Sequence, residues 1–178
     1  MSKTSLVSTK ANMKVKQNTM VLFLDVDGVL NSDSTDISLV ENLIQDDRMT
    51  LYMDKSLVHK LNSIQEAVPD VQWILSSSWR IFGINEVNKF LKDKGFTGEL
   101  IDMTPLEFCY TPRWEEIANW LRTNKHTGPY CILDDDTAGG GFRHMPRDLM
   151  RRWIQINPKV GLTQKNVKEA IELLQEVN

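Results

Sequence analysis

The organisation of this chain follows from one stretch near its start, Val21-Leu22-Phe23-Leu24-Asp25-Val26-Asp27-Gly28-Val29-Leu30. Its four leading apolar residues form a short run without helical periodicity, which predicts a buried β-strand. Asp25 and Asp27 follow the strand, and two neighbouring carboxylates are costly to bury unless a partner offsets their charge. Gly28 allows a sharp turn or the close approach of a ligand. A hard cation such as Mg²⁺, which prefers oxygen ligands, would stabilise this arrangement.

Length and composition are those of a globular protein with one domain. The 178 residues are enough to bury a full core without a second domain. The net charge of −3 argues against binding nucleic acid by bulk electrostatics alone, although it allows a local basic groove. Two cysteines without metal-ligand spacing favour reduced thiols in a cytoplasmic protein. No apolar run reaches the length of a membrane span.

Residues 1–19 differ in composition from the rest of the chain. They are rich in Ser, Thr, Lys and Asn, contain no acidic residue and lack the apolar core of a secretory signal. We therefore expect a disordered leader over 1–19 and a single domain over 20–178.

Apolar runs alternate with helical patterns along the chain. Strands are predicted at 21–24, 71–75, 99–103, 130–133 and 159–162, and helices at 54–68, 85–94, 111–122, 149–153 and after Thr163. Thr111 is expected to cap its helix with Pro112 at the first helical position, and Thr163 to cap the last helix. This alternation predicts an α/β fold with a mostly parallel, five-stranded sheet.

Three of the predicted strands run directly into polar residues, namely Asp25 and Asp27, Ser76 and Ser77, and Asp134 and Asp135. In open parallel sheets, ligands bind beyond the carboxyl ends of the strands. The sequence therefore predicts a polar site at this edge of the sheet, with acidic residues that suit Mg²⁺ and phosphate groups.

The residue types at this edge fit phosphoryl transfer. Asp25 is a candidate nucleophile, since carboxylates form aspartyl-phosphate intermediates. Asp27 is a candidate general acid and base. Ser76 could hold a phosphoryl oxygen, and Arg113, at a predicted helix start, could neutralise charge on the transferred group.

The same residues resemble the motifs of the haloacid dehalogenase (HAD) superfamily. Asp25-Val26-Asp27-Gly28-Val29 resembles its first motif, Ser76 its second, Arg113 its basic third motif and Ile132-Leu133-Asp134-Asp135 its acidic fourth. The third position is often lysine in that family. More narrowly, the runs 25–31, 75–80, 113–117, 133–136 and 161–163 are similar to the HAD domain associated with the Swiss Army knife RNA repair proteins.

This resemblance implies a Rossmannoid three-layer sandwich and a Mg²⁺-dependent phosphatase that acts on nucleic-acid ends. Asp25 would be both nucleophile and metal ligand, and Asp27 would be the acid and base with its carbonyl on the Mg²⁺. Asp134 would complete the metal site, with Asp135 in or next to the ion's ligand shell.

HAD enzymes select substrates largely through cap insertions, and both insertion positions are short in this chain. A minimal or absent cap leaves the site open to a bulky polynucleotide end. Candidate substrate contacts are Ser77, Trp79, Arg80, Arg143 and Arg147, with Arg151, Arg152 and His144 nearby. Trp79 could stack a base, because stacking on aromatic rings tolerates any sequence. Equally, Trp79 and Arg80 could be packing residues, and the arginines could form a solvated helix face.

The sequence thus predicts a phosphomonoester hydrolase that works through an aspartyl-phosphate, with RNA or DNA ends as substrates and a 3′-phosphate favoured. Two alternatives stay open. One is a small-molecule phosphatase such as a 5′-nucleotidase, whose binding would lack the salt dependence of a polynucleotide. The other is a non-catalytic module that binds phosphate. The sequence does not predict an oligomeric state.

Overall fold

The computed structural model describes residues 19–33, 52–106, 111–135 and 144–176. Its centre is a five-stranded sheet in the order β3-β2-β1-β4-β5. The strands are β1 (Val21–Leu24), β2 (Gln72–Leu75), β3 (Leu100–Met103), β4 (Tyr130–Asp134) and β5 (Trp153–Gln155). Every neighbouring pair is parallel. The predicted α/β fold with a five-stranded sheet is confirmed, and the sheet is parallel throughout.

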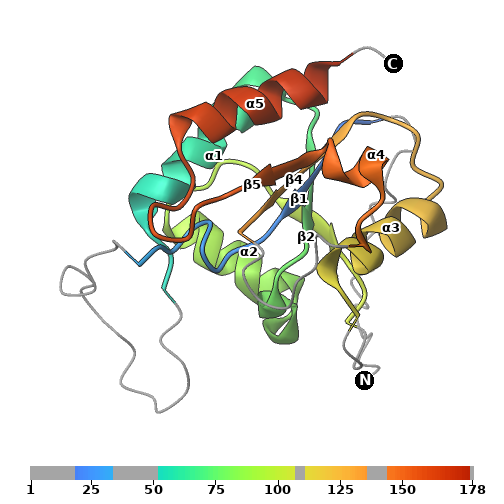
Figure 1. Cartoon of the computed structure of the whole chain (residues 1–178). Helices are drawn as coiled ribbons and strands as arrows, with labels where there is room; N and C mark the ends of the chain where they lie inside the picture. The colour runs from blue at the N-terminus through green and yellow to red at the C-terminus, as the bar shows by residue number, and fades with distance from the viewer. Residues whose placement is uncertain (1–18, 34–51, 107–110, 136–143, 177–178) are drawn as a thin grey trace, which may run out of the picture.

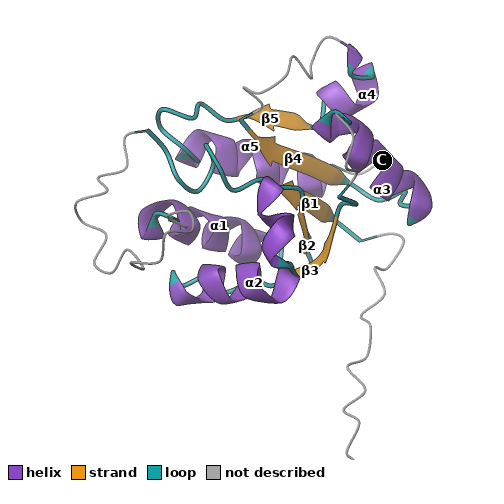
Figure 2. Ribbon diagram, turned by 90° about the horizontal axis from the view of Figure 1, so that it is seen from below, coloured by secondary structure: helices purple, strands orange, loops and turns teal. Residues whose placement is uncertain are grey.

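Helices cover both faces of this sheet and make three layers (Figure 1). They are α1 (Lys55–Ala67), α2 (Ile84–Asp93), α3 (Arg113–Thr123), α4 (Arg147–Met150) and α5 (Gln164–Gln175), with a short 3₁₀ helix, η2 (Ser78–Phe82). Helices α1, α2 and α5 lie on one face of the sheet, and α3 and α4 on the other (Figure 2). Their buried side chains form two separate core clusters. Because both faces are covered, β1 is buried along its whole length.

Two helix starts show how local sequence determines the boundaries. The Asp54 side chain accepts a hydrogen bond from Ser56 N at the start of α1. Thr163 and Asn166 form a reciprocal capping box at the start of α5, as expected for Thr163. At α3 the predicted boundary is one residue early, because Pro112 is the N-cap residue and the helix begins at Arg113.

The last strand was predicted at the wrong place. The fifth strand is Trp153–Gln155, whereas residues 159–162 form a turn in which Gly161 adopts φ 72°. The helix predicted at 149–153 is the shorter α4, which ends at Met150. β5 is an edge strand, and its three residues pair with Ile132, Leu133 and Asp134 of β4.

The structure describes one of the two cap positions in large part. Residues 80–106 form η2, α2, β3 and the turns between them, so the second position holds elements of the core. The first position includes residues 34–51, which lie outside the described residues, as do residues 1–18 of the expected leader. The predicted domain boundary at residue 20 therefore stays a prediction.

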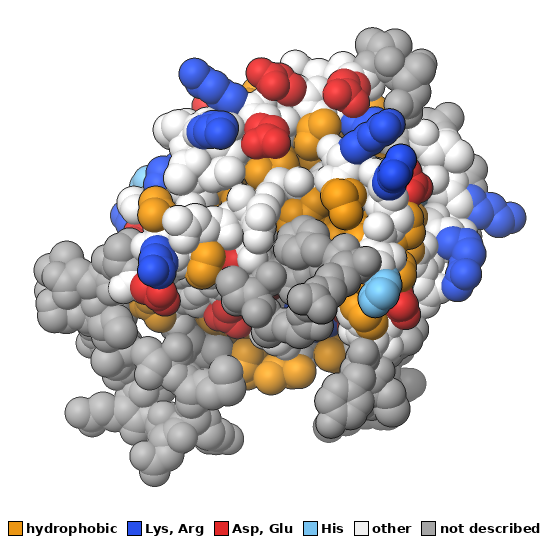
Figure 3. Space-filling view, in the orientation of Figure 1, with side chains coloured by type: hydrophobic (Ala, Val, Ile, Leu, Met, Phe, Trp, Pro, Cys, Tyr) orange, Lys and Arg blue, Asp and Glu red, His pale blue; other side chains and the backbone are white. Residues whose placement is uncertain are grey.

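The outer face of α5 is a solvated helix surface. Its exposed side chains include Lys165, Lys168, Glu169 and Glu172, and Figure 3 shows basic and acidic side chains interspersed over this helix. Within the described parts of the chain, no helix has both the length and the apolar character needed to cross a membrane.

Candidate functional site

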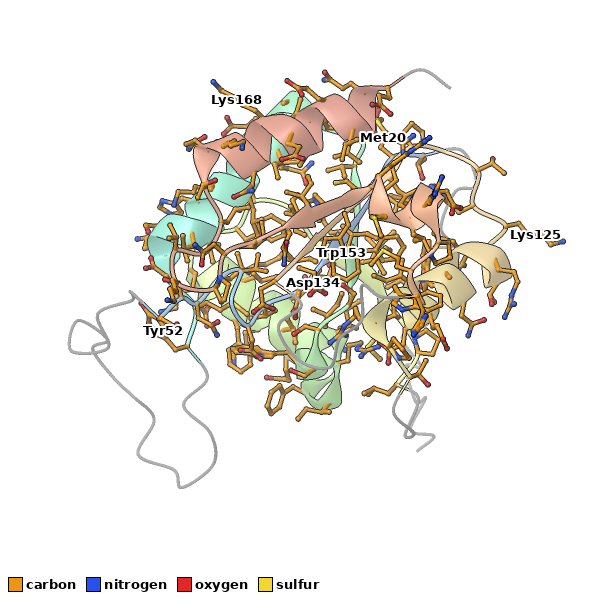
Figure 4. All side chains as sticks on the ribbon, in the orientation of Figure 1. Met20, Tyr52, Lys125, Asp134, Trp153 and Lys168 are labelled. Atoms are coloured by element: carbon orange, nitrogen blue, oxygen red, sulfur yellow. The ribbon has the colours of Figure 1, made fainter. Side chains whose placement is uncertain are left out.

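Backbone hydrogen bonds between neighbouring strands continue for one residue beyond the carboxyl ends of β1 and β2. Asp25 N donates to Leu133 O at 3.0 Å, and Ser76 N donates to Leu24 O at 2.9 Å. The residues that follow β1, β2 and β4 are thereby held next to one another. In Figure 4, Asp134 lies near the middle of the molecule at this edge of the sheet, whereas Lys125 and Lys168 lie at the periphery.

Three carboxylates gather at this edge. Asp25, Asp134 and Asp135 each present an oxygen that lies within 4.8 Å of the other two. Asp25 and Asp134 are buried and Asp135 is partly buried. Burial raises the pKa of Asp25 to about 6, while the positive charge of Arg113 opposes the rise and Asp135 adds to it. Buried carboxylates this close fit a divalent cation, because oxygen-ligated cations offset their mutual repulsion.

The turn after β1 brings the two acidic strand ends together. Gly28 has φ 72°, and a Cβ atom at this position would lie 2.4 Å from Asp135 Oδ2. Only a residue without a side chain allows the Asp135 carboxylate to come this close. Asn31 holds the turn, since its Oδ1 accepts from Gly28 N at 2.8 Å and its Nδ2 donates to Tyr52 O at 3.2 Å.

Asp27 is exposed, is not one of the three clustered carboxylates, and accepts hydrogen bonds from side chains of η2. Trp79 Nε1 donates to both of its oxygens, at 3.0 and 3.1 Å. Asn31 Nδ2 donates to Oδ1 at 2.9 Å, and Ser78 Oγ donates to Oδ2 at 3.2 Å. Side chains from two separate segments therefore fix the direction of this carboxylate.

The two serines after β2 have different surroundings. Ser76 Oγ is buried and has no hydrogen-bond partner among the described residues. A buried hydroxyl without a partner is costly, which is typical of a group that meets a ligand. The Ser77 side chain accepts from Trp79 N at 3.3 Å, and its hydrogen bond to Asp25 lowers the pKa of that carboxyl.

Arg113 brings a positive charge to the site from the first turn of α3. Its Nε lies 3.8 Å from Asp134 Oδ2, and its Nη1 lies 3.5 Å from Glu116 Oε2. The Arg113 side chain is 21% exposed, so it is only partly covered by the protein. The site thus combines an acidic cluster with one cation and a free hydroxyl, a set of groups that can bind and polarise a phosphoryl group.

The sequence matches one protein family, described as the HAD domain in Swiss Army Knife RNA repair proteins, over residues 21–167. This match covers most of the chain. The protein belongs to this HAD family. The resemblance inferred from the motifs is confirmed, and the parallel sheet agrees with the HAD fold. No curated protein and no solved structure matches the chain.

In this HAD domain, the geometry brings together most of the residues predicted for the chemistry. Asp25, Ser76, Arg113, Asp134 and Asp135 lie at one edge of the sheet. The side chain of Asp27 is outside the carboxylate cluster, so a metal contact from this residue would have to come from its backbone, as the resemblance implies.

Two predicted substrate contacts need correction. Trp79 is 3% exposed and packs edge-on against Phe82 and Phe90, so its ring has no open face on which a base could stack. Arg80 is 4% exposed and bonded to backbone and side-chain groups of the protein. Both residues hold other parts of the site in place, which was the alternative left open for them. Ser77 is also fully buried.

For the arginines after β4, a substrate contact stays a prediction. Arg143 lies outside the described residues. Arg147 is exposed at the start of α4. Among the described residues, no hydrogen bond or ion pair links its side chain to the site. Arg152 forms an ion pair with Glu176 at 2.7 Å and lies over the Tyr130 ring, so it stabilises the packing of α5 and β4.

Two further residues of the site were not predicted, Asn31 and Glu116. Asn31 lies four residues after Asp27, a spacing that allows its side chain to reach back to that carboxylate. Glu116 lies three residues after Arg113, a spacing that puts both side chains on one face of the helix. The spacing was the available signal in each case.

Proposed function

We propose that this HAD domain hydrolyses phosphomonoesters through a phosphorylated Asp25. The observation that carries the proposal is the convergence of Asp25, the partnerless Ser76 hydroxyl and Arg113 beside the carboxylate cluster. These are a nucleophile, a hydrogen-bond donor and a cation at one edge of the sheet, a set of groups that suits phosphoryl transfer.

A divalent cation, for which we propose Mg²⁺, fits the carboxylates of Asp25, Asp134 and Asp135. Their oxygens are mutually close and partly or wholly buried, and hard oxygen ligands are those that Mg²⁺ prefers. When bound, the ion neutralises negative charge on the phosphoryl group. The remaining chemistry falls to side chains of this chain.

In the first step, a carboxylate oxygen of Asp25 attacks phosphorus and the bond from phosphorus to the leaving oxygen breaks. With a pKa of about 6, Asp25 is largely ionised at neutral pH and therefore able to attack. Ser76 Oγ donates a hydrogen bond to one phosphoryl oxygen, and the guanidinium of Arg113 offsets the charge on the others. Asp27 donates a proton to the leaving alkoxide.

In the second step, water attacks the aspartyl-phosphate and inorganic phosphate leaves, which regenerates the Asp25 carboxylate. Asp27 accepts the proton of the attacking water. Its hydrogen bonds to Trp79, Asn31 and Ser78 hold it at a fixed place for both steps, and positioning of this kind supports proton transfer.

For the substrate we propose a phosphorylated nucleic-acid end, most simply a 3′-phosphate. The family description, which names RNA repair proteins, supports this choice. So does the second cap position, where the chain builds its own core rather than a separate lid over the site.

The test is Mg²⁺-dependent phosphate release by the wild type and Asp25→Asn. The panel contains p-nitrophenyl phosphate, nucleoside monophosphates, and oligonucleotides with a 3′- or a 5′-phosphate. We expect preference for the 3′-phosphorylated oligonucleotide, weaker binding as salt rises, and no release by Asp25→Asn. Faster phosphate release from nucleoside monophosphates would indicate that the substrate is a small molecule and not a nucleic-acid end. Turnover by Asp25→Asn would refute the aspartyl-phosphate intermediate. No phosphate release from any substrate of the panel would favour a phosphate-binding module.

A further inference from the structure

Four charged side chains form an alternating row that ends at the site. Arg80 Nη2 lies 2.9 Å from Glu116 Oε2, Glu116 Oε2 lies 3.5 Å from Arg113 Nη1, and Arg113 Nε lies 3.8 Å from Asp134 Oδ2. The row runs from the closed to the accessible side of the domain, because Arg80 is 4% exposed and Arg113 is 21% exposed. From this row we infer that Glu116 is a positioning residue, which aims the Arg113 guanidinium at the phosphoryl group bound at Asp25.

Arg80 fixes the inner end of this row. Its Nε donates to Ser77 O at 2.6 Å, and its Nη1 donates to Thr104 Oγ1 at 2.5 Å and to Pro105 O at 2.7 Å. These partners follow β2 and β3, so the guanidinium ties two strand ends to α3 through Glu116. The position of Glu116 is therefore set by the sheet as well as by its own helix.

Glu116 contacts the two arginines at different distances. The contact to Arg80, at 2.9 Å, is that of a full charge-assisted hydrogen bond, whereas the contact to Arg113, at 3.5 Å, is at the long limit. Glu116 is thus mainly neutralised by Arg80. It orients Arg113 while leaving most of the Arg113 charge for another anion.

The acidic cluster explains why Arg113 needs this second carboxylate. On its other side the guanidinium faces Asp134, and its charge also acts on Asp25. With Glu116 removed, the attraction of these two carboxylates would be unopposed, and Arg113 would turn towards them. Among the described residues, no hydrogen bond or ion pair engages Nη2 of Arg113, which leaves that edge of the fork for a phosphoryl oxygen.

The kinetic test rests on the proposed phosphatase function and uses a double-mutant cycle. Glu116→Gln keeps the size of the side chain but removes its charge. We expect it to lower kcat for p-nitrophenyl phosphate by about tenfold to 100-fold in the wild-type background, the cost of a misplaced catalytic group. In the Arg113→Ala background the same change should lower kcat by less than about twofold, because Glu116 acts through Arg113. Equal factors in both backgrounds would overturn the inference.

A matched control separates this effect from a general change in charge. Glu115 is exposed on the same turn of α3, so Glu115→Gln removes an equal charge and should leave kcat unchanged. A loss of kcat in Glu115→Gln as large as that in Glu116→Gln would also count against Glu116. If Glu116→Gln does not fold, Glu116→Asp takes its place in the cycle, since it keeps the charge but shortens the reach to Arg113.

A second readout needs no turnover. The Nε–Hε signal of Arg113 in a ¹H–¹⁵N spectrum, assigned with Arg113→Ala, reports how firmly the guanidinium is held. We expect this signal to shift or broaden in Glu116→Gln and to stay in place in Glu115→Gln. An unchanged signal in Glu116→Gln would refute the inference. If the wild type releases no phosphate, the proposed function fails and this spectrum alone decides whether Glu116 positions Arg113.

Discussion

The replacement Gly28→Ala tests how the proposed metal site is built. Gly28 has φ 72°, and a side chain in such a conformation costs about 1–3 kcal/mol. For a chain of this size, each kcal/mol lowers Tm by about 2–4 °C. The new methyl group would also lie 2.4 Å from Asp135 Oδ2, which is well below the 3.4 Å at which ordinary van der Waals contact begins.

The clash determines the effect on metal binding. The Asp135 carboxylate must move by roughly 1 Å, whereas metal–oxygen distances tolerate only about 0.2 Å. We therefore expect Gly28→Ala to weaken Mg²⁺ binding by about tenfold to 100-fold, the usual cost of disturbing the groups around a metal. Isothermal titration calorimetry with Mg²⁺ measures the affinity, and thermal unfolding in EDTA measures the stability of the metal-free protein.

Gly83→Ala is the matched control. Gly83 has φ 80°, and a Cβ atom there would meet nothing within 4 Å. It should therefore lose stability through its backbone alone and bind Mg²⁺ as the wild type does. Equal Mg²⁺ affinities in Gly28→Ala and the wild type would refute the reasoning, because Asp135 would then not need the space above Gly28.

Three other changes have expected outcomes. In metal-free protein, native Asp25 binds its proton more tightly than the unfolded chain does, so the free energy of unfolding should fall by up to about 3 kcal/mol as pH rises from about 4 to about 6. Asp25→Asn should abolish this fall in urea titrations, and a persisting slope would contradict the assignment. Ser76→Ala should leave stability unchanged or raise it by about 1 kcal/mol while phosphate release drops, since its hydroxyl has no described partner to lose; a clear loss of stability would show a structural hydroxyl. Trp79→Phe removes the donor to Asp27 and should slow release from alkyl phosphates more than from p-nitrophenyl phosphate, which has the better leaving group. Equal slowing would show that Trp79 only packs.

The place of the acidic and hydroxyl residues at one edge of the sheet could be predicted because their signals are local. Each central strand is a run of apolar residues, and the polar residue that ends it must lie at the carboxyl edge of a parallel sheet. Asp25, Ser76 and Asp134 were assigned to one edge on this ground alone. Strand β5 lacked such a signal, because only two of its three residues are buried and the run at 159–162 looked as apolar.

The residues that hold the site in place could not be predicted in the same way. For Trp79 both base stacking and packing stayed open, since nothing near it in the sequence shows that its ring contacts Phe82 and Phe90. Glu116 looks like any acidic residue in a first helical turn, where an acid is favoured in any case. Its partner Arg80 follows a strand far earlier in the chain, and only the folded sheet brings the two together.

The site therefore has two halves that depend on different physical features. In the acidic half, Gly28 leaves out a side chain so that Asp135 can approach, and three carboxylates lie close enough together to suit a cation. In the cationic half, buried Arg80 and Glu116 neutralise each other and leave Arg113 with its charge at the surface. In the proposed reaction, the phosphoryl group would meet a cation at the acidic half and the guanidinium at the other. It follows that damage at Gly28 should appear first as lost metal affinity, and damage at Glu116 first as lost turnover at saturating metal.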